Sequence, residues 1–215
     1  MENRDSRLVV FARAPIPGQV KTRLIPTMGA KAAATLYEKL VFHSLATAVK
    51  AGVGTVELWC TPSHKHPFFI HCAREFQVEL HKQRGRDIGQ RMAHAFYETL
   101  KMCHSVVLIG SDVPCLTCAD LREAIVLLQQ GADAVISPAE DGGYVLLGLR
   151  HYTSKIFSGV SWGTNLVLAQ TRTRLRSLGW HWQELSTRWD VDQPEDVQRL
   201  TLEGFSHLVV KGELI

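Results

Sequence analysis

The stretch Val-Val-Leu-Ile-Gly-Ser-Asp-Val-Pro, residues 106–114, decides the fold. Its four leading apolar residues, 106–109, predict a buried strand that ends at Gly110. Asp112 follows the strand, at the edge of the sheet where open α/β folds bind their ligands. A carboxylate at that edge can hold a hard divalent cation together with phosphate oxygens. The stretch therefore predicts an α/β protein with an acid at its ligand-binding edge.

Short apolar runs and amphipathic segments alternate on both sides of this strand. Further strands are expected at residues 7–13, 55–60, 77–80 and 133–137. Helices, with apolar residues three and four positions apart, are expected at residues 30–50, 66–75, 88–100 and 118–130. Such alternation predicts a mostly parallel sheet with helices on both faces, a Rossmann-like three-layer α/β/α sandwich.

The pattern changes after Pro138. Asp-Gly-Gly at residues 141–143 precedes an apolar run, which predicts a hairpin or an antiparallel edge strand. A helix at 165–178, a strand at 180–185 and a helix from Pro194 complete the chain. Because the 215 residues contain no linker, repeat or low-complexity segment, we expect a single domain spanning residues 1–215.

Composition and charge exclude several classes of protein. The hydrophobic content of 46% is typical of a globular chain. A net charge of +3, without a basic cluster interleaved with aromatics, disfavours nucleic-acid binding. The first residues carry charges and then a short apolar run, which indicates neither a signal peptide nor a membrane span. We therefore expect a cytoplasmic protein that acts on small molecules.

The cysteines are expected to be reduced thiols, because their number, five, is odd and no export signal is apparent. Cys115 and Cys118 form one CxxC pair, and three histidines, 64, 66 and 71, lie near Cys72. A zinc site would need a second ligand pair at matching spacing. Buried thiols and a polar histidine-bearing loop are the favoured interpretation.

A basic loop follows the first strand. Arg13, at the end of that strand, lies within eleven residues of Lys21 and Arg23. The two latter residues belong to the segment 14–26, which contains three prolines and Gly18 and is expected to lack regular structure. Cations fixed at the carboxyl edge of a central strand suit a polyphosphate, whose charge they neutralise. The Walker pattern is absent. Solvated surface charges are the alternative interpretation.

Three acidic segments could complete a site. Thr117 is available to cap the next helix, which leaves Asp112 free for a ligand. In residues 140–144, Glu-Asp-Gly-Gly-Tyr, the glycines allow the backbone to approach a ligand closely, although an ordinary hairpin turn is the alternative. Asp190 and Asp192 point the same way in an extended chain. A second carboxylate beside Asp112 would complete a magnesium site; otherwise Asp192 caps the last helix.

Five motifs, PGQVKTRLIP, QRGRDIGQRM, GSDVPCLT, EDGGYVLLGL and WDVDQPEDVQRL, occur in this order over residues 7–202. Together they resemble the bacterial GT-A-fold, glycosyltransferase-like family that includes the radical-SAM/selenodomain-associated transferases. That family is similar to 2-phospho-lactate guanylyltransferase and the molybdenum-cofactor guanylyltransferase, and more distantly to sugar nucleotidyltransferases. The chain departs from the last group in its proline-rich loop, which has one glycine, and in its single acid before Pro114.

The resemblance implies roles for individual residues. Lys21 and Arg23 match the phosphate-contacting basic loop, and Asp112 matches the metal-binding acid of the GT-A fold. Asp192 looks like the second metal acid of the CMP-sugar synthetases. The segment that contains Asp141, Gly142, Gly143 and Tyr144 matches a DGGY motif that would face the acceptor.

These features together predict a transferase that depends on Mg²⁺ or Mn²⁺ and uses a nucleotide donor. In the favoured version, a phosphorylated small-molecule acceptor attacks the α-phosphate of a nucleoside triphosphate, while Lys21, Arg23 and Arg13 stabilise the developing charge. Gly18 would let the basic loop approach the nucleotide. Glycosyl transfer from a nucleotide sugar and a nucleotide-binding module without turnover remain alternatives. Neither nucleic acid nor membrane is an expected partner.

Overall fold

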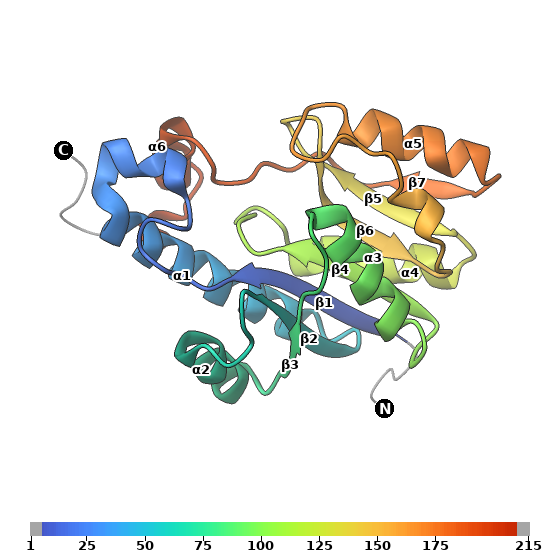
Figure 1. The fold of residues 1–215 in the computed structure, drawn as a ribbon, viewed down its shortest axis with the longest axis horizontal. Coiled ribbons are helices and arrows are strands. Elements are labelled where there is room, and N and C mark those ends of the chain that lie inside the picture. The colour runs from blue at the N-terminus through green and yellow to red at the C-terminus, as the bar shows by residue number, and fades with distance from the viewer. Residues whose placement is uncertain (1–5, 210–215) are drawn as a thin grey trace.

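Seven strands form one sheet in the computed structural model, which describes residues 6–209 (Figure 1). The strand order is β3-β2-β1-β4-β6-β5-β7. The strands are β1 (Ser6–Arg13), β2 (Thr55–Thr61), β3 (Glu79–Lys82), β4 (Ser105–Gly110), β5 (Ala134–Pro138), β6 (Tyr144–Leu149) and β7 (Trp182–Glu184). All pairs are parallel except those that β6 makes. The expected mostly parallel α/β sheet is confirmed.

The antiparallel strand lies inside the sheet. β6 pairs with β4 on one side and with β5 on the other, so the tight turn before Tyr144 returns the chain next to β5. Its residues after Tyr144 are buried, which suits a strand with neighbours on both edges and cover on both faces. The predicted strand and its antiparallel direction are confirmed, but the expected edge position is wrong, because β6 has a neighbour on each side.

Helices cover both faces of the sheet and produce the predicted three layers (Figure 1). Alternate side chains of β1 divide between two cores: Leu8 and Val10 pack on one face, Val9 and Phe11 on the other. The first face carries α1 (Ile25–Ala51), α2 (Pro67–Phe76) and α4 (Cys118–Gln129). The second carries α3 (Ile88–Thr99), the short helix η2 (Ser154–Ile156) and α5 (Val167–Ser177).

The loop after β1 is shorter than the sequence predicts. A short helix, η1 (Thr22–Leu24), follows Lys21, and α1 begins at Ile25. The prediction of no regular structure over residues 14–26 is therefore wrong beyond residue 21. Pro26 lies in the first turn of α1, where no backbone amide is needed. Gly29, at φ 80°, separates this turn from the helix expected at residue 30.

All five cysteines are free thiols. The thiol of Cys115 donates to the carbonyl of Trp189, whereas that of Cys118 donates to the carbonyl of Thr47, so the CxxC pair has two separate surroundings. Among the described helices, none combines the length and apolar character needed to span a membrane. Residues 1–5, which contribute to the expectation of no export signal, lie outside the described part.

One extended segment crosses the carboxyl ends of the strands. Residues 185–193, here named the crossing segment, lead from β7 to α6 (Pro194–Leu202), which packs beside the start of α1 (Figure 1). Backbone amides fix its path: Arg188 donates to the carbonyl of Pro138 at the end of β5, and Val191 donates to the carbonyl of Asp112 after β4, at 2.9 Å each. After α6, the short helix η3 (Ser206–Leu208) ends the described chain. The crossing segment therefore brings Asp190 and Asp192 to the end of β4.

The expected cap at Thr117 is present, and it yields a stability prediction. The Thr117 hydroxyl accepts a hydrogen bond from the Asp120 amide, and the Asp120 carboxylate accepts one from the Thr117 amide at 2.8 Å. Thr117→Ala should lower the free energy of unfolding by about 1 kcal/mol, measured by urea denaturation. The control Thr173→Ala, which removes an exposed hydroxyl from α5, should change it less. Equal effects of the two changes would contradict the capping role.

Candidate functional site

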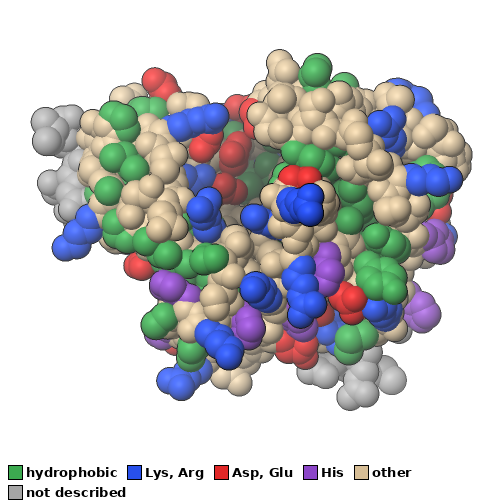
Figure 2. All heavy atoms as spheres, in the orientation of Figure 1, with side chains coloured by type: hydrophobic (Ala, Val, Ile, Leu, Met, Phe, Trp, Pro, Cys, Tyr) green, Lys and Arg blue, Asp and Glu red, His purple; other side chains and the backbone are tan. Residues whose placement is uncertain are grey.

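A cleft of about 590 Å³ opens at the carboxyl ends of β1 and β4. Figure 2 shows it as a hollow in which acidic side chains lie deep, with Lys and Arg side chains around them. The lining residues come from the basic loop, α1, α3, the end of β4, the loop before β6, the loop before α5 and the crossing segment. They are Arg13, Gln19, Val20, Lys21, Thr22, Arg23, Tyr37, Ile88, Met92, Asp112, Asp141, Gly143, Tyr144, Trp162, Gly163, Thr164, Val167 and Asp192.

Lys21 and Asp112 form an ion pair at the floor of this cleft. Lys21 Nζ lies 2.7 Å from Asp112 Oδ2, and the lysine side chain is only 6% exposed. Burial alone would lower the pKa of Lys21, but the Asp112 carboxylate raises it above its ordinary value. Lys21 also adopts the left-handed conformation, with φ 45° and ψ 45°, which is uncommon for a non-glycine residue. Such local strain is typical of functional sites.

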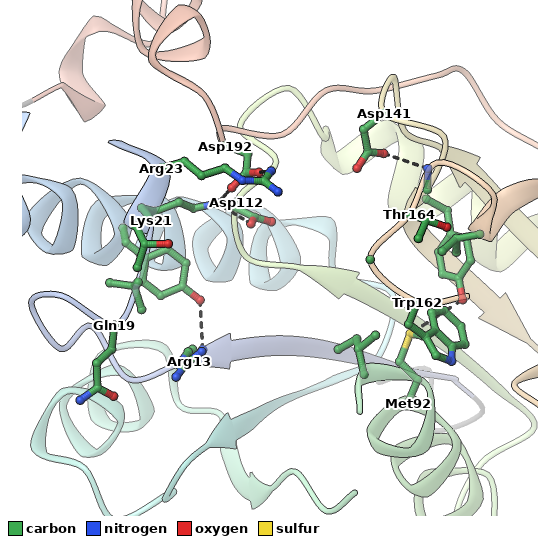
Figure 3. A pocket seen from close by; sticks show the side chains of 18 residues that line it. Arg13, Gln19, Lys21, Arg23, Met92, Asp112, Asp141, Trp162, Thr164 and Asp192 are labelled. Atoms are coloured by element: carbon green, nitrogen blue, oxygen red, sulfur yellow. Dashed lines mark hydrogen bonds and ion pairs between the residues drawn. The ribbon is translucent and has the colours of Figure 1, made fainter. Parts of the chain in front are cut away.

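Asp192 reaches the same lysine from the crossing segment. Its Oδ1 lies 4.0 Å from Lys21 Nζ, and its other oxygen is ion-paired with Arg23 (Figure 3). Four expected site residues from three separate motifs, Lys21, Arg23, Asp112 and Asp192, thus lie together. Because two carboxylates converge on one cationic nitrogen, a compact cation fits between them. An all-oxygen donor set of this kind suits Mg²⁺ or Mn²⁺.

The loop from Asp141 to Tyr144 forms the next part of the cleft. Asp141 Oδ1 accepts a hydrogen bond from the Gly143 amide at 2.8 Å, which closes the turn. Gly142, at φ +88°, does not line the cleft: a Cβ there would lie 2.4 Å from the carbonyl oxygen of Asn165. Gly142 therefore supports the loop against the segment before α5, whereas Asp141, Gly143 and Tyr144 face the cleft.

The remaining basic-loop residues differ in position. Arg13 lines the cleft, and its backbone amide donates to the Tyr37 hydroxyl, which also bonds Ser111. Gly18 is not among the described residues that line the cleft, and its φ of +83° instead serves the turn of the loop. Tyr37 joins α1 to the ends of β1 and β4, a link that its place in a helical apolar pattern does not reveal.

Asp190 is an acid that sequence reasoning noticed but did not place in the site. With Gly110, Asp112 and Asp141 it lines a smaller cavity of about 120 Å³ beside the cleft. Burial, and then the negative charge of Asp112, raise the pKa of Asp190 to about 6. Alternation with Asp192 is its only signal in the sequence. Its unusual surroundings depend on the path of the crossing segment.

The raised pKa of Asp190 predicts a pH-dependent stability. A carboxyl group whose pKa is higher in the folded state stabilises the fold below its unfolded pKa, about 3.9, and this contribution is lost as the pH rises through about 6. Asp190→Asn should therefore be more stable than the parent above that pH, by on the order of 1 kcal/mol allowing for solvent screening. Near pH 4 the difference should vanish. Urea denaturation with a chelator present measures it, and a pH-independent difference would contradict the assignment.

An apolar wall of the cleft lies opposite the charged side chains of Lys21, Asp112 and Asp192. Trp162 and Met92 lie on the far side from Lys21 in Figure 3. The Tyr144 and Trp162 rings meet edge to face at 6.5 Å, and the Tyr144 hydroxyl lies 3.9 Å from Met92 Sδ. Ile88, expected on the buried face of its helix, is 40% exposed and lines the cleft. Trp162 has no signal in the sequence that marks it as a site residue.

The place of Trp162 in this apolar wall depends on Gly89. A Cβ at Gly89 would lie 2.1 Å from the Trp162 indole nitrogen, so the indole occupies the space that any side chain would take. Gly89→Ala should lower the free energy of unfolding, measured by urea denaturation, by about 1–3 kcal/mol, because the indole ring must move. In a Trp162→Ala background the same substitution should cost much less. An equal loss of unfolding free energy in both backgrounds would show that Trp162 does not restrict the side chain at residue 89.

Comparison with known families identifies the chain. Residues 44–164 match a family model described as uncharacterized proteins conserved in bacteria (DUF2064). The chain belongs to this family. A solved structure of a proposed nucleotide-diphospho-sugar transferase from Desulfovibrio desulfuricans G20 is 31% identical, with a TM-score of 0.80. The match covers 88% of this DUF2064 chain and 83% of that protein.

More distant structures share the fold alone. CMP:2-keto-3-deoxy-manno-octonic acid synthetase, solved with CTP, is 12% identical over 94% of this chain and 99% of that one, with a TM-score of 0.60. Glucosyl-3-phosphoglycerate synthase from Mycobacterium tuberculosis, solved with Mn²⁺, UDP and glucosyl-3-phosphoglycerate, is 11% identical. That match covers 96% of this chain and 80% of the synthase, with a TM-score of 0.57. No curated protein sequence matches the chain.

Proposed function

We propose that this DUF2064 protein is a divalent-metal-dependent transferase that uses a nucleotide donor. The observation that carries the proposal is the convergence of Asp112 and Asp192 on Lys21, with Arg23 beside them, at the ligand-binding edge of the sheet. The 31% identical relative, a proposed nucleotide-diphospho-sugar transferase, and the shared fold of the CTP and UDP complexes support a nucleotide at this edge. Kinship with radical-SAM/selenodomain-associated transferases stays a prediction.

The charges of the cleft suit a polyphosphate. Arg13, Lys21 and Arg23 supply three cationic groups on one wall. Asp112 and Asp192 would hold Mg²⁺ or Mn²⁺, which when bound neutralises phosphate charge and polarises the reacting phosphate. A nucleotide phosphate that engages Lys21 and Arg23 would compete with their ion pairs to the two acids. Those carboxylates would then be available to the metal ion.

The proposed reaction is nucleotidyl transfer. A phosphate oxygen of the acceptor forms a bond to the α-phosphorus of a nucleoside triphosphate, and the bond from that phosphorus to the bridging β-oxygen breaks. Pyrophosphate leaves with the electron pair, while Lys21 and Arg23 stabilise charge that develops on the phosphate oxygens. An acceptor phosphate is already ionised at neutral pH, so no general base is required. The role of the protein is to position the reactants and stabilise charge.

Glycosyl transfer from a nucleotide sugar is the second candidate, favoured by the proposed activity of the 31% identical relative. In this reaction a hydroxyl oxygen of the acceptor forms a bond to the anomeric carbon of the sugar, the bond from that carbon to the nucleoside diphosphate breaks, and the diphosphate leaves with the electron pair while the hydroxyl proton passes to water. The same cations would stabilise the leaving diphosphate. The leaving group distinguishes the two reactions: pyrophosphate in the first and a nucleoside diphosphate in the second.

A ligand screen followed by product analysis tests the proposal. Each nucleoside triphosphate and common nucleotide sugars are added with Mg²⁺ or Mn²⁺, and binding is measured as a rise in melting temperature. Donors that bind are then incubated with phosphorylated acceptors, and phosphorus NMR identifies pyrophosphate or nucleoside diphosphate. Binding without turnover on any acceptor would favour a nucleotide-binding module. Absence of metal-dependent nucleotide binding would contradict the proposal.

Single substitutions in the floor of the cleft should remove metal-dependent nucleotide binding or lower the turnover. Asp112→Asn should remove the metal-dependent part of nucleotide binding, and Lys21→Met should lower the turnover by about a hundredfold or more. Matched controls lie outside the cleft: Asp133→Asn, an acid paired with Arg150, and Lys101→Met, a lysine paired with Glu98. Both controls should leave nucleotide binding unchanged. Wild-type metal dependence in Asp112→Asn would exclude this carboxylate as a ligand.

A further inference from the structure

A group of side chains of metal-ligating types lies on β2 and β3, away from the cleft described above. In the parallel pairing of these strands, Glu57 stands opposite Glu79, and Trp59 stands opposite His81. Because side chains two positions apart project to the same face, all four side chains share one face of the sheet. Glu57, Trp59 and His81 line a pocket of about 410 Å³, which is separate from the cleft and bounded by α3.

The donor atoms already have the spacing of a coordination site. His81 Nε2 lies 3.8 Å from Glu57 Oε2 and 3.5 Å from Glu79 Oε2, and all three ligand atoms lie within 4.8 Å of one another. Zinc bonds to nitrogen and oxygen of about 2.1 Å correspond to a tetrahedral edge of about 3.4 Å between ligands. The two distances from His81 lie within a few tenths of an ångström of that edge, and the two glutamates would close on the ion by rotating their carboxylates.

The charges of the group favour a further cation. Arg7 contacts both carboxylates, at 2.5 Å from Glu57 and 3.4 Å from Glu79. One guanidinium balances only one of two carboxylates that stand directly opposite each other, an arrangement that costs free energy when left unbalanced. Glu57 is 1% exposed, so water does little to screen its charge. The second carboxylate, Glu79, faces His81, and Lys82, Arg84 and Glu98 also line the pocket.

Glu57 is oriented as a ligand by its other contacts. Arg7 binds its Oε1, which leaves Oε2 directed at His81. Trp59 Nε1 donates to Oε2 at 2.7 Å, and the Thr99 hydroxyl donates to it at 3.1 Å. Metal-binding carboxylates are commonly held by hydrogen bonds of this kind, which fix their direction before the ion arrives.

Two more histidines line the same pocket. His64 and His94 each have a buried Nδ1 atom without a hydrogen-bond partner among residues 6–209, and so does Nε2 of His81. His81 stacks on the Trp59 ring at 4.9 Å, and His94 meets that ring edge-on at 5.6 Å. Unpartnered imidazole nitrogen atoms around one pocket are available as ligands, and water or one of these histidines would complete a four-coordinate ion.

We propose that Glu57, Glu79 and His81 bind a divalent transition-metal ion, with Zn²⁺ as the ion best matched to the site. One imidazole and two carboxylates form a mixed nitrogen and oxygen set, which suits Zn²⁺ better than Mg²⁺. The ion would join β2 to the edge strand β3 beside α3, and it would stabilise this end of the sheet. The proposal is independent of the nucleotide cleft and of the function proposed for it.

Zinc binding to the full chain tests the proposal. The protein is stripped of metal with a chelator and titrated with Zn²⁺ by calorimetry, in an Asp112→Asn background that excludes the cleft. One equivalent should bind, and the melting temperature should rise with Zn²⁺. His81→Asn and Glu79→Gln should each weaken binding by at least about tenfold. Glu79 is an exposed side chain, so this variant keeps the test valid if other changes disturb folding.

Cobalt and a matched histidine provide the controls. Co²⁺ at the site should give the intense visible absorption of a four-coordinate ion, lost in His81→Asn. His151→Asn removes a histidine that lies equally near a carboxylate, 3.8 Å from Asp133, and should leave Zn²⁺ affinity unchanged. Absence of saturable Zn²⁺ binding, or a Zn²⁺ affinity in His81→Asn and Glu79→Gln equal to that of the parent protein, would overturn the proposal.

Discussion

The ion pair between Lys21 and Asp112 joins the two central strands of the sheet at their ligand-binding ends. Lys21 belongs to the loop after β1, Asp112 to the loop after β4, and these strands are neighbours. The Val191 amide bonds the Asp112 carbonyl, so the crossing segment is fixed to the same point. A lysine that is 6% exposed needs a carboxylate beside it, because an unpaired buried charge is strongly destabilising. The position of the basic loop, and with it of Arg23, depends on this contact.

The cleft has two unlike walls because different parts of the chain supply them. The charged wall comes from the loop after β1, the end of β4 and the crossing segment. The apolar wall comes from the start of α3 and from Trp162, whose indole fits only because residue 89 is a glycine. Charge on one side and aromatic surface on the other suit a ligand with a phosphate part and a ring part. In our proposal for the cleft, the phosphates lie against Lys21 and Arg23.

Two pairs of acidic residues show why residue types alone do not define a site. Asp190 and Asp192 are two positions apart, but Asp192 pairs with Arg23, whereas burial and the charge of Asp112 raise the pKa of Asp190 to about 6. Glu57 and Glu79 are 22 positions apart in the chain and yet stand directly opposite each other across β2 and β3. What each carboxylate can do therefore depends on its partners, which the pairing of strands and the path of loops determine.

The sequence by itself determined the order of strands and helices, because apolar periodicity is a local property that burial imposes on each element. It also predicted that Lys21, Arg23, Asp112 and Asp192 belong together, from the rule that parallel strands end at one edge and from the order of motifs. Only the tertiary structure decided that β6 lies inside the sheet, that Gly142 supports a loop, and that Trp162 lines the cleft. These features rest on contacts between residues far apart in the chain, such as Gly89 with Trp162 and Asp112 with Val191, and local patterns do not record such contacts.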